Sequence, residues 1–101
     1  MALTLKAAME DYQAAYDILT ELAEDYEAAP DVTDIASAAA NEIEVQYIEE
    51  EAEDEDELED QYADFIDYLE SVIEDLEDNE LEGRPLNQLK KCLTKARKRF
   101  A

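Results

Sequence analysis

The stretch LEDQYADFIDYLESVIEDL, residues 58–76, decides the fold. Its large apolar side chains recur at alternating intervals of four and three positions, at Leu58, Tyr62, Phe65, Leu69, Val72 and Leu76. This heptad spacing is typical of an amphipathic helix that packs nearly parallel or antiparallel to another helix. Asn79 and Gly83 follow the stretch, and both residue types favour the end of a helix. We therefore predict a helix over residues 58–78.

The N-terminal part of the chain has a second heptad stripe. Its apolar positions are Leu5, Met9, Tyr12, Tyr16, Leu19, Ala23 and Tyr26. Thr4 is suited to cap a helix N-terminus, and Pro30 disfavours continuation of the helix before it. The pattern predicts a helix over residues 4–28, with its acidic residues, Asp11 among them, on the opposite polar face.

Residues 31–48 continue the helical periodicity, with Asp31 or Thr33 as the expected N-cap. Within this segment, three apolar residues alternate with polar ones as in a β-strand: Ile43, Val45 and Tyr47. A single strand would have no partner in this chain, and Ala-rich sequence precedes it. We therefore favour a helix throughout.

Two segments remain. Residues 49–57 hold eight acidic side chains in nine positions, a pattern typical of a solvated loop, and we expect an acidic linker there. Residues 85–100 have an apolar stripe from Leu86 to Phe100, and Pro85 is allowed at a first helical position. We expect a last helix there, with a basic outer face.

Amphipathic helices with short connections predict an all-α fold, a small antiparallel bundle of three to four helices. The 101 residues leave no room for a second core, so we expect a single domain over residues 1–101. Heptads do not reveal whether a helix packs against its own chain or a second copy, and a homodimer stays open.

The charge is segregated along the chain. All 30 Asp and Glu residues precede Gly83, where Lys6 is the only cation, so residues 1–83 carry a net charge of −29. Residues 84–101 carry +7 and no acidic residue, which gives −22 for the whole chain. Most acidic helices gain stability from Lys placed four residues after Glu, whereas this chain accepts self-repulsion. A basic last helix beside acidic ones would relieve that repulsion locally.

The composition excludes several kinds of catalytic and metal site. Without His, and with Cys92 as the only Cys, the chain has no Ser-His or Cys-His nucleophile pair and no Cys- or His-ligated zinc site. A calcium loop beginning at Asp54 would have Leu58 at its fifth position and Phe65 at its twelfth, where calcium needs side chains with oxygen ligands. The segment therefore fails the calcium-loop pattern. We therefore expect no enzyme activity, no cofactor and no metal site.

The sequence also bears on the location of the protein. No stretch approaches the roughly 18 apolar residues that cross a membrane, and the first residues lack the order of a signal peptide. Cys92 suits a reducing interior, and it flanks an apolar stripe where a buried structural thiol is expected. We expect a cytoplasmic protein without membrane contact.

The acidic residues are dense enough to imitate a polyanion. Residues 49–82 hold 19 carboxylates in 34 positions, about one per 2.7 Å of helix, against about one per 1.7 Å of duplex DNA. Lys and Arg side chains that track phosphates would bind such a surface by the same charge pairing. We expect the partner-binding residues to be Glu49, Glu50, Glu51, Asp54, Asp56, Asp60, Asp64, Asp67, Tyr68, Glu70, Glu74 and Asp78.

In composition and charge spacing, residues 1–83 resemble the DNA mimics of phages and mobile elements. These are small, acidic and often helical proteins, rich in Tyr, and they include anti-restriction and anti-CRISPR proteins. The resemblance implies an inhibitor that occupies the nucleic-acid site of a basic host protein or nuclease complex, without binding nucleic acid itself. The basic segment after Gly83 departs from the uniformly acidic pattern of many such proteins.

Two other interpretations fit the composition. One is an acidic chaperone or adaptor that shields a basic partner protein. The other is a structural bundle whose acidity reflects a salt-rich cytoplasm, although a net charge of only about 2 to 8 keeps a small domain soluble. Among the tyrosines, Tyr68 lies off the heptad seam and is the candidate for an exposed aromatic contact.

Overall fold

A computed structural model describes residues 3–25 and 27–100 of the chain. The described residues form α1 (Leu5–Ala23), α2 (Pro30–Ile43), a π-helical turn η1 (Glu44–Ile48), α3 (Glu55–Asp78) and α4 (Arg84–Phe100). The prediction of an all-α fold is confirmed. None of the described helices combines the length and the apolar character that crossing a bilayer requires.

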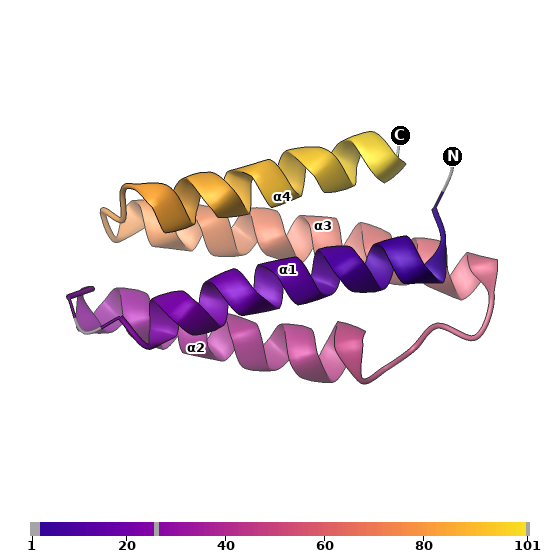
Figure 1. The fold of residues 1–101 in the computed structure, drawn as a ribbon, viewed down its shortest axis with the longest axis horizontal. Helices are drawn as coiled ribbons and strands as arrows, with labels where there is room; N and C mark the ends of the chain where they lie inside the picture. The colour runs from indigo at the N-terminus through magenta and orange to yellow at the C-terminus, as the bar shows by residue number, and fades with distance from the viewer. Residues whose placement is uncertain (1–2, 26, 101) are drawn as a thin grey trace.

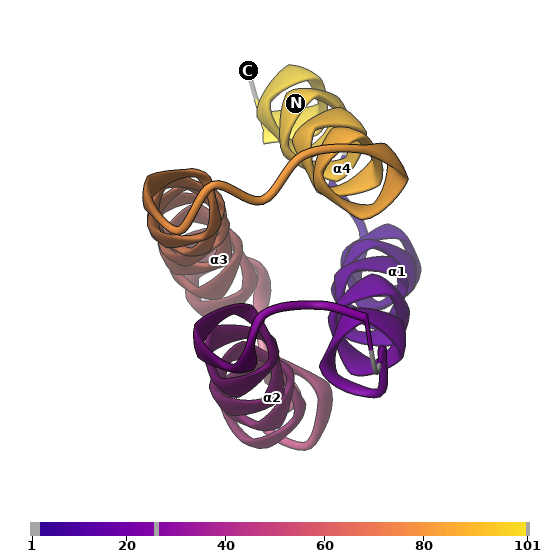
Figure 2. The ribbon, with the colours of Figure 1, turned by 90° about the vertical axis from the view of Figure 1, so that its left-hand side faces the viewer.

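Consecutive helices run antiparallel, so the chain goes up and down the bundle in sequence order (Figure 1). Seen end-on, the four helices lie at the corners of a square (Figure 2). Each side of the square is a pair of packed helices: α1 with α2, α2 with α3, α3 with α4, and α4 with α1. The basic helix α4 therefore lies between α1 and α3, and it does not pack against α2.

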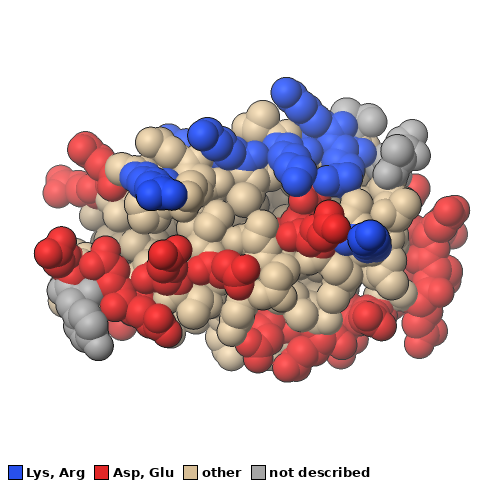
Figure 3. All heavy atoms as spheres, viewed as in Figure 1, with Lys and Arg blue, Asp and Glu red and all other residues tan. Residues whose placement is uncertain are grey.

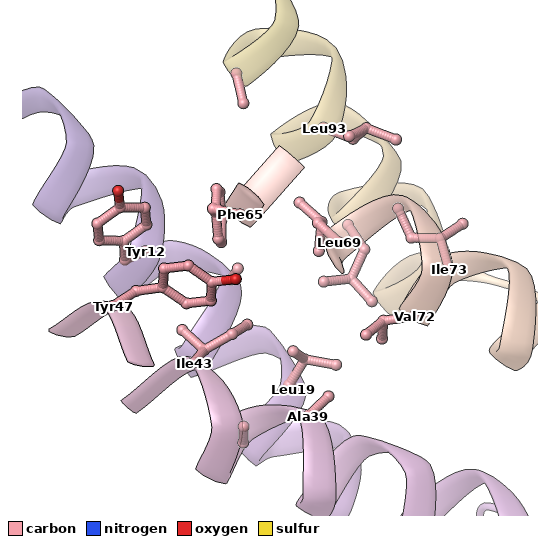
Figure 4. Close-up of a cluster of buried hydrophobic side chains, with 14 of the residues drawn as sticks. Tyr12, Leu19, Ala39, Ile43, Tyr47, Phe65, Leu69, Val72, Ile73 and Leu93 are labelled. Atoms are coloured by element: carbon pink, nitrogen blue, oxygen red, sulfur yellow. The ribbon is translucent and has the colours of Figure 1, made fainter. Parts of the chain in front are cut away.

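The predicted heptad seams meet in one core (Figure 4). Every seam residue of α3 from Leu58 to Leu76 is buried, as are Leu86, Leu89 and Leu93 of α4. The ring of Phe65 meets those of Tyr12 and Tyr47 edge-on, at centroid distances of 4.7 and 5.5 Å. Edge-to-face pairs of this kind add stability beyond the area that they bury. The predicted seam of α1 is only partly correct, since Tyr12 and Leu19 are buried, whereas Leu5 is 36% exposed. The other predicted positions, Met9, Tyr16 and Ala23, are half-buried at the edge of the core.

The predicted N-cap of α1 is confirmed, but the predicted C-terminus is wrong. The Thr4 hydroxyl accepts a hydrogen bond from the Ala7 N–H at 3.1 Å. The helix ends at Ala23 instead of continuing to residue 28. The carboxylate of Asp25 accepts a hydrogen bond from the Glu27 N–H, a local turn that competes with helix. Tyr26, which the seam included, lies outside the described residues.

Helix α2 begins at Pro30, so the expected N-cap at Asp31 or Thr33 is wrong. A proline fits the first helical position because its fixed φ suits the helix and no N–H is needed there. The N-cap residue is Ala29, which has no side-chain hydrogen bond, and the Thr33 hydroxyl donates to the Pro30 carbonyl at 2.9 Å. The proline therefore starts this helix rather than only ending the preceding segment.

The segment with strand-like alternation is helical, as predicted, but its last turn is wider than an α-turn. In η1 the Glu49 N–H donates to the Glu44 carbonyl at 2.8 Å, an i to i+5 hydrogen bond. Ile43 and Tyr47 are buried, whereas Val45 is 44% exposed. The apolar alternation thus does not correspond to one buried face.

The predicted linker over residues 49–57 is too long, because α3 begins at Glu55 rather than at residue 58. The Asp54 carboxylate accepts a hydrogen bond from the Glu57 N–H at 2.8 Å, and acidic residues fill the first turn. Negative charge is favourable at a helix N-terminus, which explains why so acidic a sequence is helical here. The end of α3 at Asp78 is confirmed. Helix α4 begins one residue before the predicted start, after Gly83 with φ of +104°.

Candidate partner-binding surface

The outer face of α3 presents part of the predicted carboxylate row. Asp60, Asp67, Glu74 and Asp78 are all exposed, on the side of the helix away from the core. In the described part of the chain, none of them has a Lys or Arg nitrogen within 4.0 Å. The first three follow at seven-residue intervals, so they lie on one line with steps of about 10 Å.

Two residues of the predicted row are engaged with neighbouring helices instead. The Tyr47 hydroxyl of η1 donates to the Asp64 carboxylate at 2.8 Å. Burial raises the pKa of Tyr47, and the hydrogen bond to Asp64 raises it further. On the other edge of α3, Glu70 is paired with Arg97 of α4. The row is therefore divided, with Asp64 turned toward η1 and Glu70 toward α4.

The acidic loop, residues 49–54, joins η1 to α3 at one end of the bundle (Figure 1). Of the predicted partner-binding residues, Glu49, Glu50, Glu51 and Asp54 lie in it, and Asp56 lies in the first turn of α3. All five are exposed. The structure thus groups them at one end, apart from the long row on α3.

Tyr68 is not the exposed aromatic residue that the sequence predicted. It is half-buried and packs against the core, with its ring 6.4 Å from that of Tyr47. Burial raises the pKa of Tyr68, and the carboxylates of Glu42 and Asp75 add to the effect. Its position off the seam faces α2 rather than solvent, which the spacing alone does not distinguish.

The basic helix is held to the bundle by ion pairs with both of its neighbours. Lys90 pairs with Glu77 of α3 at 3.1 Å, and Arg97 with Glu70 of the same helix. Toward α1, Arg99 and Lys95 reach Asp11 at 3.0 and 3.7 Å. Figure 3 shows most of the cations gathered at the edge of the molecule where α4 lies, with carboxylates over the opposite edge and both ends. This helix therefore relieves repulsion on two of the acidic helices.

Sequence reasoning placed Asp11 wrongly on the polar face of α1. It is only 5% exposed, and the Tyr62 hydroxyl of α3 donates to its carboxylate at 2.6 Å. The Arg99 Nε–H of α4 donates to the same oxygen at 3.0 Å, so one carboxylate joins three helices. Burial raises the pKa of Tyr62, and the bond to Asp11 raises it further. Its position beside the seam residue Tyr12 was not a sufficient signal, because Gln13 also adjoins Tyr12 and is exposed.

Most of the acidic charge has no cationic partner. Among the described residues, only Asp11, Glu70 and Glu77 of the 30 acidic side chains have a Lys or Arg nitrogen within 4.0 Å, which leaves 27 without one. The remaining carboxylates are fixed to helices and short loops of one packed bundle. They therefore form an ordered anionic surface whose charge is not neutralised by ion pairs with Lys or Arg of the same chain.

Cys92, the single cysteine of the chain, lies at the edge of the core. Burial raises the pKa of the Cys92 thiol, and Asp11 raises it further, while Lys95 acts in the opposite direction. This thiol is half-buried against the core, which supports the structural role expected for it. In residues 3–25 and 27–100, no three acidic or Cys side chains converge in the way that a metal site needs.

Comparison with known proteins found no relative. No protein-family model matches the chain, and no curated protein or solved structure matches it.

Proposed function

We propose that this protein inhibits a nucleic-acid-binding protein by occupying its basic nucleic-acid site in place of DNA. The observation that carries the proposal is the ordered carboxylate surface, with 27 of 30 acidic side chains lacking a cation within 4.0 Å in the described part of the chain. A cleft lined with Lys and Arg gains the same charge-assisted hydrogen bonds from carboxylates as from phosphates.

The charge spacing on α3 supports this proposal. Twelve of its 24 residues are acidic, and ten remain after the ion-paired Glu70 and Glu77 are set aside. A helix of this length spans about 36 Å, so these ten give about one charge per 3.6 Å, against about one per 3.4 Å along one DNA strand. A groove that follows a phosphate strand would find a similar charge density along α3.

The partner is tested by capture and competition. The immobilised protein is exposed to a bacterial lysate at low salt, and bound proteins are eluted first with duplex DNA and then with rising salt. We expect a basic nucleic-acid-binding protein that duplex DNA displaces, with affinity falling steeply as salt rises. Bound proteins that duplex DNA leaves in place would contradict mimicry and favour an adaptor that shields a basic partner.

A triple variant of α3 and a matched triple variant of α1 test whether the partner contacts α3. Asp60→Asn, Asp67→Asn and Glu74→Gln together remove three exposed charges without touching an ion pair or the core. We expect at least about a tenfold loss of partner affinity with unchanged helicity, because each phosphate-like contact contributes a charge-assisted bond.

The matched control changes three exposed acidic residues of α1, with Glu10→Gln, Asp17→Asn and Glu21→Gln. It alters the net charge equally and leaves α3 intact, so we expect only a small effect on affinity. An equal loss in both triple variants would mean that bulk charge, and not the α3 row, drives binding.

A further inference from the structure

The helical segment formed by α2 and η1, called here the second helical segment, ends at Ile48. The acidic loop, residues 49–54, begins at this carboxyl end, which is an unfavourable place for negative charge. The carboxyl end of a helix carries partial negative charge, and its last carbonyls lack N–H partners within the helix. Glu49, Glu50 and Glu51 follow η1 directly, and no cation occurs in the sequence from residue 10 to residue 82. Repulsion alone would turn this loop out into solvent.

One side chain of α3 opposes that tendency. The Gln61 carboxamide donates to two backbone carbonyls, that of Gln46 in η1 at 3.2 Å and that of Glu50 in the acidic loop. Its oxygen accepts a hydrogen bond from the Tyr12 hydroxyl of α1 at 3.2 Å. Both N–H groups and the oxygen of this amide are thus used. A residue of α3 thereby caps the carboxyl end of the second helical segment.

The other contacts of the loop are local or apolar. The Glu53 N–H donates to the Glu57 carboxylate at 3.2 Å, and Asp54 caps α3. Ala52 packs at the edge of the core. In the described part of the chain, Gln61 is therefore the side chain that ties the first half of the loop to the bundle.

We infer that Gln61 is the positioning residue of the acidic loop, and that it holds Glu49, Glu50 and Glu51 as a fixed part of the surface that meets a basic segment of the partner. The ordering of the loop stands apart from the proposed function, whereas its use in binding rests on it. A loop fixed before binding loses less conformational freedom on binding than a mobile one.

The ordering is tested on the free protein by ¹⁵N relaxation. In the parent protein we expect order parameters for residues 49–54 near the rigid value of about 0.85, and in Gln61→Met below about 0.6. Gln13→Met is the matched control, because Gln13 is exposed and bonds only to Asp17 on the same helix. Tyr12→Phe removes one hydroxyl and leaves both Gln61 donors, so its loop should stay ordered. Mobility of this loop in the parent protein, or a rigid loop in Gln61→Met, overturns the inference.

A second measurement separates this inference from the proposed function. Gln61→Met should bind the DNA-displaced protein from the capture experiment about tenfold more weakly, since two hydrogen bonds that order the loop are lost. Unchanged affinity despite a mobile loop would remove the loop from the binding surface. If no captured protein is displaced by DNA, the proposed function fails, while the relaxation result still decides the role of Gln61.

Discussion

Replacing Asp11 with Asn tests the reasoning about the bundle most directly. The Asp11 carboxylate is the one buried charged group among the described residues, and it joins α1 to Tyr62 of α3 and Arg99 of α4. Asn has nearly the same shape, but it is neutral and carries an NH₂ group in place of one acceptor oxygen. Tyr62 and Arg99 both donate to Oδ2, so in Asp11→Asn the amide oxygen can take that place while the NH₂ group faces Lys95. Both hydrogen bonds then lose their charged acceptor, and Arg99 and Lys95 lose their counter-charge.

The expected cost follows from these contacts. A hydrogen bond to a charged group contributes about 1.5–3 kcal/mol, and removing one partner of a fully buried ion pair costs about 3–5 kcal/mol. Arg99 is 24% exposed and Lys95 63% exposed at the side chain, so both regain water when the charge is lost. We therefore expect Asp11→Asn to lower the free energy of unfolding by about 2–3 kcal/mol, or roughly 10–20 °C in Tm.

The assay is urea unfolding followed by far-ultraviolet circular dichroism, with an unchanged m-value as the sign that the same structure unfolds. Asp17→Asn is the control, because it removes the same charge from an exposed site of the same helix. At a net charge of −22 this control should be neutral or slightly stabilising. Equal stabilities of the two variants would refute the assignment of Asp11 as a buried link.

A double-mutant cycle with Tyr62→Phe isolates the shorter of the two hydrogen bonds. Since the Tyr62 hydroxyl and the Asp11 carboxylate are 2.6 Å apart, the two changes should be non-additive by about 1–2 kcal/mol. Additive effects would mean that the two groups act independently and that the cost of Asp11→Asn arises from α4 alone.

Two further predictions concern pH and salt. Burial raises the pKa values of Tyr12, Tyr47 and Tyr62 above the ordinary value near 10, so the folded state keeps protons that the unfolded state releases. Stability should therefore be intact below about pH 10 and fall above it, by up to about 4 kcal/mol per pH unit, and tyrosinate absorbance should appear together with unfolding. Ionisation of these tyrosines without loss of helicity would contradict this prediction. Raising NaCl from about 0.01 to 0.5 M should stabilise the protein by roughly 2 kcal/mol, because salt screens like charges one helical turn apart. A constant or falling Tm would contradict uncompensated repulsion.

The fold was largely predictable because the heptad seam of α3 is unambiguous, although the seam predicted for α1 is only partly buried. The seam of residues 58–76 is buried throughout, as are the main apolar positions of α4. Helix boundaries were less predictable, since they depend on single caps that compete with the general pattern. Asp54 starts α3 three residues early by capping it, and Pro30 starts a helix although it also prevents the preceding one from continuing.

The candidate surface was predictable as a region but not residue by residue. Composition identifies an acidic face on α3, yet Asp64 and Glu70 at its two edges are bonded to neighbouring helices. The roles of Asp11 and Gln61 could not be predicted, because their partners lie far away in the sequence. Tyr62 is 51 residues from Asp11, and Tyr12 is 49 residues from Gln61. Without knowing which helices adjoin, a polar residue beside a seam is indistinguishable from one on the solvent face.

The placement of the cations bears on what the acidity is for. A chain selected for stability alone would distribute Lys over all its helices, one turn from the acidic residues. Here the cations from Arg84 onward lie on one helix, whose ion pairs neutralise only the edges of α1 and α3 that face it. The outer face of α3, the acidic loop and α2 keep their full charge. This arrangement stabilises the bundle while leaving an anionic surface without internal ion pairs, which supports the proposed competition with a polyanion.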